Sequence, residues 1–279
     1  METDRRKYWT EAMDAAYAFM LAVQGYPIDE CKERGVPLRE AVAEAGVEVF
    51  FSELPHVRGL PRLYFLRAGL VPSFITASRE LNSRGRALRV EDAYRTREMQ
   101  KYNALRPEVF PLVLAKVRWE LGGAIPSIDL FQRRLAALIA MNPRVGTHCS
   151  GSAIDVSVID RSTGFEVDRG APYLDISEKT PMSSPYVSAE ARQNRVEITA
   201  LMARCGFQTY RFEFWHYNAG DIYAAYLEKS GRPARYGPVD LDPSTGRVTP
   251  IEDAARPLNS PAEIEDRIRE LLRSKNGNP

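Results

Sequence analysis

Apolar residues recur at helical spacing through much of the first 140 residues. The spacing predicts five helical stretches, over residues 9–24, 38–45, 68–83, 97–121 and 128–141. Gly85 breaks the pattern after the third stretch, and Pro107 and Pro111 interrupt the fourth. Asn142-Pro143 ends the fifth. The N-terminal part of the chain is therefore expected to be mainly helical.

Other segments alternate between apolar and polar residues, which is the period of a β-strand. Residues 87–94 alternate well enough to predict a strand that delivers Arg95 to its end. The alternation is clean over residues 152–159, where Asp155 lies on the polar face of the predicted strand. A predicted helix over 189–205 is followed by an aromatic segment, 207–217, that predicts another strand. Together these elements predict an α+β fold, with a small, mostly antiparallel sheet flanked by helices.

The pattern changes after about Ser230. Residues 231–257 are rich in Pro, Gly and Asp and predict an irregular arm, so we divide the chain into a domain of residues 1–230 and a C-terminal segment of 231–279. Ser260 and Glu263 form a capping box before a helix, whose apolar stripe contains Ile264, Ile268, Leu271 and Leu272. The favoured partner of this stripe is the chain's own core, and the alternative is a homo-oligomer contact.

Composition limits the classes of partner. The 279 residues include 38 basic and 37 acidic side chains, so no global field attracts nucleic acid or an anionic membrane. The apolar runs fall far short of the ~20 residues that a membrane helix needs. The start of the chain does not resemble a secretory signal, and we expect a cytoplasmic protein. Three cysteines at wide spacing argue against a disulfide framework. A small or locally charged substrate is the expected partner.

Two short segments carry residues suited to a catalytic zinc site, which needs three protein ligands and a nearby base. In the first, a glycine turn separates His148 from Asp155. In the second, Glu213 precedes His216 by three residues, so an ideal strand would point the two side chains to opposite faces. The backbone must bulge or turn there if both serve one site. Taken alone, a histidine in an aromatic strand is more often a buried structural residue.

Taken together, the two segments resemble the signatures of a known family. Gly146-Thr-His148-Cys-Ser-Gly-Ser-Ala-Ile-Asp155 is similar to the S-x-H-x-x-G-x-A-x-D signature of the D-Ala-D-Ala metallopeptidases. Glu213-Phe-Trp-His216 is similar to the E-W-W-H signature of the VanX-type dipeptidases. Asp92-Ala-Tyr-Arg95 and Ser177-Glu-Lys-Thr180 resemble further segments of the family. The matches follow the family's order over roughly residues 88–216.

The resemblance implies a function and a role for each residue. His148, Asp155 and His216 would bind one zinc ion in a central cleft, and Glu213 would act as the general base. Arg95 would stabilise the oxyanion. Tyr94 and Asp175 would contact the substrate. The expected activity is zinc-dependent hydrolysis of D-alanyl-D-alanine or a related small dipeptide.

The sequence departs from the family at two positions that concern the substrate's amino group. Gly146 replaces the first serine of the signature. Leu174 stands where the family has an aspartate, and Asp175 comes one place late. A shift of one residue on an extended segment turns a side chain to the other face, unless a local irregularity brings it back. We therefore expect the catalytic residues to be kept and the recognition of a free amino terminus to be altered.

Other interpretations of the same residues stay open. One is a zinc carboxypeptidase or amidase that acts on a longer or N-blocked substrate. Another is a non-catalytic zinc-binding recognition module, against which Glu213 argues because a structural site has no use for a base. A remote alternative is a thiol hydrolase built on Cys149, which we interpret instead as a packing residue. His56 lacks a carboxylate at ligand spacing and is expected in a loop or at the surface.

Overall fold

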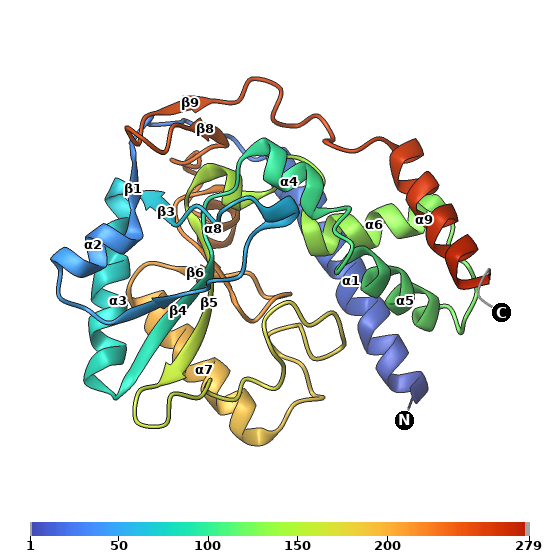
Figure 1. Cartoon of the computed structure of the whole chain (residues 1–279), viewed down its shortest axis with the longest axis horizontal. Coiled ribbons are helices and arrows are strands. Elements are labelled where there is room, and N and C mark those ends of the chain that lie inside the picture. Colours follow the sequence, from blue (N-terminus) through green and yellow to red (C-terminus); the bar gives the residue numbers. More distant parts are fainter. Residues whose placement is uncertain (1, 277–279) are drawn as a thin grey trace.

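A five-stranded sheet forms the centre of the fold in the computed structural model, which describes residues 2–276 (Figure 1). The last residues of the predicted C-terminal segment, 277–279, lie outside this range. The strands in spatial order are β2 (Val49–Phe51), β4 (Arg86–Asp92), β5 (Ala153–Asp160), β7 (His216–Asn218) and β6 (Gln208–Thr209). Only the β2–β4 pair among them is parallel. The fold is thus α+β with a mostly antiparallel sheet, as the sequence predicted.

Helices surround this sheet in two groups. In chain order they are α1 (Glu2–Gln24), α2 (Leu38–Glu44), α3 (Val71–Ser83), α4 (Arg97–Asn103), α5 (Phe110–Glu120), α6 (Ile128–Ile139), α7 (Ala189–Arg204), α8 (Ile222–Glu228) and α9 (Pro261–Asn276). Helices α2, α3 and α7 lie around the sheet, whereas α1, α5, α6 and α9 gather on the other side of the molecule (Figure 1). The predicted helices are confirmed within a few residues, with two exceptions: α1 begins seven residues before the predicted start at residue 9, and the stretch over 97–121 divides into α4 and α5.

The alternation of β5 decides what the sheet presents to each side. Ile154, Val156 and Val158 are fully buried in the main core cluster, together with residues of β4, α3 and α7. Asp155 therefore leaves the opposite face of the strand, as the sequence predicted. Because every residue of β5 up to Ile159 is buried, the strand holds its polar side chains away from solvent.

Residues 207–217 do not form the continuous strand that the aromatic pattern predicted. Short strands β6 and β7 flank a tight turn, in which the Glu213 backbone N–H donates to the Tyr210 carbonyl at 3.0 Å and the His216 N–H to the Glu213 carbonyl at 3.2 Å. The rings of Tyr210 and Phe212 pack with α1 and α8 instead of alternating across a sheet. The turn that Glu213 and His216 require is therefore present.

The predicted irregular arm contains a hairpin. Strand β8 (Val239–Leu241) pairs antiparallel with β9 (Val248–Pro250), and strands β1 (Gly35–Pro37) and β3 (Phe65–Arg67) form another small pair. Val239, Leu241 and Val248 pack with Tyr94 in a small apolar cluster. The hairpin is tied to the rest of the fold, and the division at residue 230 stays a prediction.

The C-terminal helix α9 begins at the predicted capping box. The Glu263 backbone N–H donates to Ser260 Oγ at 3.2 Å, and the Ser260 N–H donates to Glu263 Oε2 at 2.6 Å. Ile264 and Ile268 are buried in a cluster with residues of α5 and α6. The stripe is covered by the chain itself, which confirms the favoured interpretation; a homo-oligomer contact stays untested.

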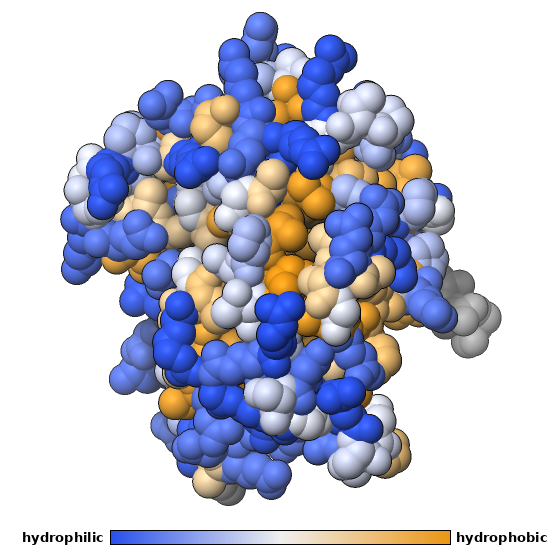
Figure 2. Space-filling view, turned by 90° about the vertical axis from the view of Figure 1, so that its left-hand side faces the viewer, coloured by the Kyte–Doolittle hydropathy of each residue, from blue (hydrophilic) through white to orange (hydrophobic). Residues whose placement is uncertain are grey.

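The outer surface over α2 and α3 is mostly hydrophilic, with apolar residues showing mainly in a central strip (Figure 2). Among residues 2–276, no helix has both the length and the apolar character that crossing a bilayer requires.

The docking of α9 predicts the effect of shortening its buried side chain. Ile264→Ala should lower the free energy of unfolding by about 2–5 kcal/mol because it leaves a cavity between α9 and α6. Urea-induced unfolding measures this loss. Glu270→Ala, on the exposed face, is the control and should change stability by no more than ~0.5 kcal/mol. Equal stability of both variants would contradict the docking.

Candidate metal centre

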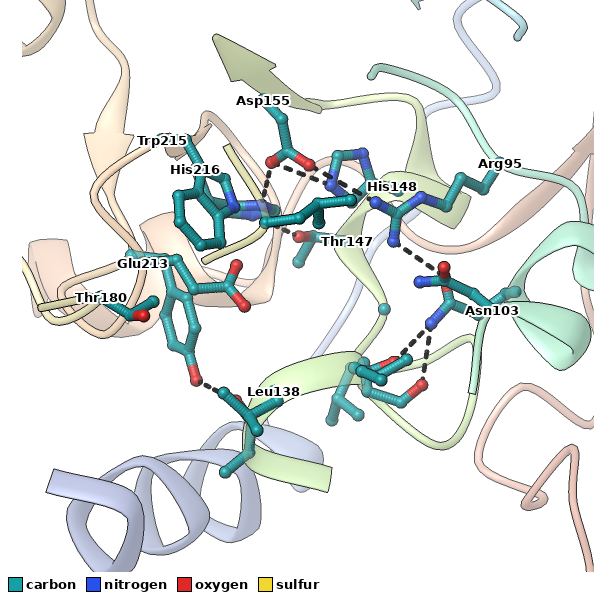
Figure 3. Close-up of a pocket in the computed structure, with 18 of the residues that line it drawn as sticks. Arg95, Asn103, Leu138, Thr147, His148, Asp155, Thr180, Glu213, Trp215 and His216 are labelled. Carbon is teal, nitrogen blue, oxygen red and sulfur yellow. Dashed lines mark hydrogen bonds and ion pairs between the residues drawn. The ribbon is translucent and has the colours of Figure 1, made fainter. Parts of the chain in front are cut away.

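Two imidazoles and a carboxylate converge on the face of the sheet opposite the main core cluster. His148 lies in a single 3₁₀ turn (Thr147–Ser150), Asp155 on β5 and His216 on β7 (Figure 3). One potential ligand atom from each residue lies within 4.8 Å of the others. All three residues are at most 5% exposed. This group could hold a metal ion.

The backbone explains why the three residues meet. Asp155 and His216 are direct partners in the antiparallel pairing of β5 and β7, so their side chains leave the same face of the sheet. His148 precedes β5, and the chain turns back at Gly151, whose φ of 68° is left-handed and favours glycine. The turn places the imidazole of His148 beside the carboxylate of Asp155.

Hydrogen bonds orient each ligand. His148 Nδ1 lies 2.5 Å from the Ala93 carbonyl oxygen, which fits donation by Nδ1–H and leaves Nε2 3.3 Å from Asp155 Oδ1. His216 Nδ1 lies 2.9 Å from the same oxygen, and Thr147 Oγ1 lies 3.1 Å from His216 Nε2. Burial by itself would raise the pKa of Asp155, but the imidazoles of His148 and His216 hold it well below its usual range. The carboxylate is thus ready to bind a cation.

Glu213 faces the same pocket from the turn between β6 and β7 (Figure 3). Burial raises the pKa of Glu213 to about 8, while the nearby His216 lowers it. A cation held by the three ligands would lower the pKa of Glu213 below this raised value. A buried carboxylate with such a pKa can accept and return a proton near neutral pH.

Arg95 is fixed at the edge of the site by two carboxylates. Its Nε donates to Asp92 Oδ2 at 2.8 Å, and its Nη2 lies 3.4 Å from Asp155 Oδ2. Arg62 and His56 also contact Asp92, at 3.2 and 3.3 Å. His56 lies in a loop, one of the two places expected for it, but it is buried and not at the surface, because its carboxylate partner comes from a strand distant in sequence.

The two predicted substrate contacts have different outcomes. Tyr94 does not face the pocket: its hydroxyl donates to the Val239 carbonyl at 2.9 Å and accepts from the Leu241 N–H at 3.0 Å. That prediction was wrong because the β8–β9 hairpin covers the ring. Asp175 lines the pocket together with Leu174, whose φ of 65° is left-handed. The local irregularity that would bring Asp175 back is thus present.

Two residues of the site were not singled out from the sequence. The Tyr173 hydroxyl donates to Asp155 Oδ2 at 3.0 Å, and its ring packs edge-on against Trp215. Thr147 contacts His216, as described above. In the sequence, only their positions close to the motifs could have indicated these two residues. Cys149 is fully buried, and burial raises the pKa of its thiol to about 12, which fits a packing residue and not a nucleophile.

The pocket beside these residues is a cavity of about 70 Å³. Its wall includes apolar side chains such as Leu138 and Ile176 besides the polar residues described above. The space suits a small ligand.

Comparison with known proteins gives a consistent picture. A family model described as D-ala-D-ala dipeptidase matches residues 127–230, a range that includes the three candidate ligands and Glu213 but not Arg95. D-alanyl-D-alanine dipeptidases of Enterococcus faecalis, Enterococcus faecium and Escherichia coli are similar to this chain. They are 33%, 32% and 33% identical to it over 75, 92 and 70 residues, respectively. These matches cover 27%, 33% and 25% of this chain, and 37%, 44% and 36% of those proteins. The chain thus matches less than half the length of these relatives.

Two solved structures are similar at low scores. The LD-carboxypeptidase LdcB is 15% identical with a TM-score of 0.35, over 75% of this chain and 80% of that one. The D,D-pentapeptidase VanY, in complex with Zn(II), is 17% identical with a TM-score of 0.34, over 68% of this chain and 89% of that one. With scores this low, nothing about activity follows from either likeness.

The contact of Tyr173 with Asp155 predicts an effect on metal affinity. Tyr173→Phe removes a hydrogen bond that orients the carboxylate, and zinc affinity should fall by about 10- to 100-fold. Competition with a chromogenic chelator measures the affinity. Tyr186→Phe, a partly buried tyrosine outside the pocket, should bind zinc as the wild type does. Unchanged affinity in Tyr173→Phe would show that this contact does not support the site.

Proposed function

We propose that the protein is a zinc-dependent peptidase that hydrolyses D-alanyl-D-alanine or a closely related small dipeptide, because the D-ala-D-ala dipeptidase family model matches residues 127–230. The observation that supports this proposal is the convergence of His148, Asp155, His216 and Glu213 on one buried pocket. Two imidazoles and one carboxylate fit zinc, and three protein ligands leave a position for water or substrate.

In this proposal each residue has a defined task. Zinc, when bound, supplies the Lewis acidity that makes a water molecule nucleophilic near neutral pH. Glu213 accepts the proton of the attacking water and returns it to the leaving amine. Arg95, held by Asp92, directs a permanent positive charge toward the carbonyl oxygen on which negative charge develops. Tyr173 and Thr147 keep the ligands in place.

The amino end of the substrate is assigned to Asp175. Its carboxylate reaches the pocket wall because Leu174 adopts a left-handed conformation, and it accepts a hydrogen bond from Ser177 Oγ. A free ammonium group would gain a charge-assisted bond there. Recognition of the amino end would then differ from the family in its backbone geometry while keeping a carboxylate. A cytoplasmic location stays a prediction.

Replacing the proposed base separates an enzyme from a zinc-binding recognition module. Glu213→Ala should lower kcat for D-alanyl-D-alanine by about 10²- to 10⁴-fold, because no group then takes the proton from water. Metal analysis should still find one zinc per chain, since Glu213 is not among the three ligands. Glu213→Gln, which keeps the shape of the side chain, should behave in the same way. Full activity of both variants would overturn the assignment of the base.

The role of Asp175 predicts a preference for the free dipeptide over its N-acetylated form. Asp175→Asn should lower kcat/KM for D-alanyl-D-alanine by about 10- to 100-fold, which corresponds to a charge-assisted hydrogen bond of about 1.5–3 kcal/mol. Hydrolysis of N-acetyl-D-alanyl-D-alanine should not change. Asp129→Asn, an exposed position on α6, is the control. A wild type that prefers the acetylated peptide would instead support a carboxypeptidase or amidase on N-blocked substrates.

A further inference from the structure

Asn103, the last residue of α4, is a polar residue of the pocket to which no role has been given. The residue is only 9% exposed and lines the cavity. Among the side-chain hydrogen bonds of residues 2–276 none involves its carboxamide, and the carboxamide atoms are not among the fully buried unpaired ones, so they are accessible from the pocket. Polar groups of folded proteins are normally hydrogen-bonded to protein, water or ligand, and this amide bonds no protein group. The free hydrogen-bonding capacity of Asn103 therefore points to a ligand in the pocket.

The position of Asn103 indicates which part of a ligand it meets. Asn103 and Arg95 lie on one side of the pocket, and Glu213 and Thr180 lie on the other (Figure 3). Thr180 Oγ1 donates to the backbone carbonyl of Asp175 at 2.6 Å, which puts Asp175 on the Thr180 side. The pocket is thus polarised, with a carboxylate at one end and a guanidinium with an amide at the other. Such a pocket complements a small zwitterion.

The neighbours of Asn103 on this wall of the pocket have no free side-chain hydrogen-bond donor. Gln100, one turn earlier on α4, donates through Nε2 to the carbonyls of Ile139 and Ala140 at 2.6 and 2.8 Å, and its Oε1 faces Arg95 Nη1 at 3.4 Å. Gly146 beside it offers no side chain, and a Cβ there would lie 3.5 Å from Gln100 Cδ. Asn103 is therefore placed to supply the polar contact that neither of these residues can make.

We propose that Asn103 is a specificity-determining residue that binds the free C-terminal carboxylate of the dipeptide by donating from Nδ2. The inference rests on the proposed function, because it takes the substrate's ammonium group to lie at Asp175. A C-terminal amide or a further residue would present a weaker acceptor or none to Asn103. The residue would thus restrict the enzyme to peptides that end at the pocket.

The test compares D-alanyl-D-alanine with its C-terminal amide, using the full chain loaded with zinc. Asn103→Ala should lower kcat/KM for the free acid by about 10-fold, mainly through KM, and change the value for the amide by no more than about 2-fold. Asn103→Asp should lower kcat/KM for the acid by about 100-fold, because two carboxylates then repel each other. A merely structural role would lower both substrates alike. Glu98→Ala, on the exposed side of α4, should leave both values unchanged.

Binding without turnover gives a second readout. In a Glu213→Ala background, calorimetry should show that Asn103→Ala weakens binding of D-alanyl-D-alanine by about 10-fold and leaves binding of the amide unchanged. An unchanged ratio of acid to amide in both Asn103 variants, while the wild type hydrolyses the dipeptide, would overturn the role of Asn103 alone. A changed preference between free and N-acetylated dipeptide would place Asn103 at the amino end and also overturn it. A zinc-loaded wild type that hydrolyses neither peptide would overturn the proposed function and this inference together.

Discussion

The pairing of Asp155 with His216 across β5 and β7 is the constraint on which the site depends. The two residues are register partners, so a slip of one residue would turn one of the side chains to the other face of the sheet. The register is held by the core, because Ile154 and Val156 are fully buried on the opposite face of β5. Packing of apolar residues therefore fixes the geometry of polar ones, and His148 joins them through the turn at Gly151.

Burying these charges has a cost that the surrounding groups offset. Asp155 is 2% exposed and meets two imidazoles, a tyrosine hydroxyl and a guanidinium. Asp92 repeats the arrangement with Arg95, Arg62 and His56. A buried ion pair adds little net stability compared with well-packed apolar residues. Two such clusters joined by Arg95 therefore fit a preorganised site better than a device that stabilises the fold.

The sequence predicted most of this arrangement where the signal was local. Periodicity located the helices, the alternation of β5 assigned Asp155 to the polar face, and the spacing of Glu213 and His216 required the turn that is observed. The prediction from sequence failed where a residue's contact partner is distant along the chain. Tyr94 is covered by a hairpin some 145 residues later, with its hydroxyl bonded to the carbonyl of Val239. Leu174 adopts a left-handed conformation although it is not a glycine, so the sequence did not indicate it. The return of Asp175 to the pocket could therefore be given only as an alternative.

The proposed function requires one zinc ion in the space between the three ligands. Anomalous diffraction from crystals grown with zinc, recorded on both sides of the zinc absorption edge, tests it most directly. We expect one strong peak per chain, bounded by the side chains of His148, Asp155 and His216, at the zinc–nitrogen and zinc–oxygen distances of about 2.0–2.2 Å. An absent peak, or a peak bound by other residues, would contradict the account.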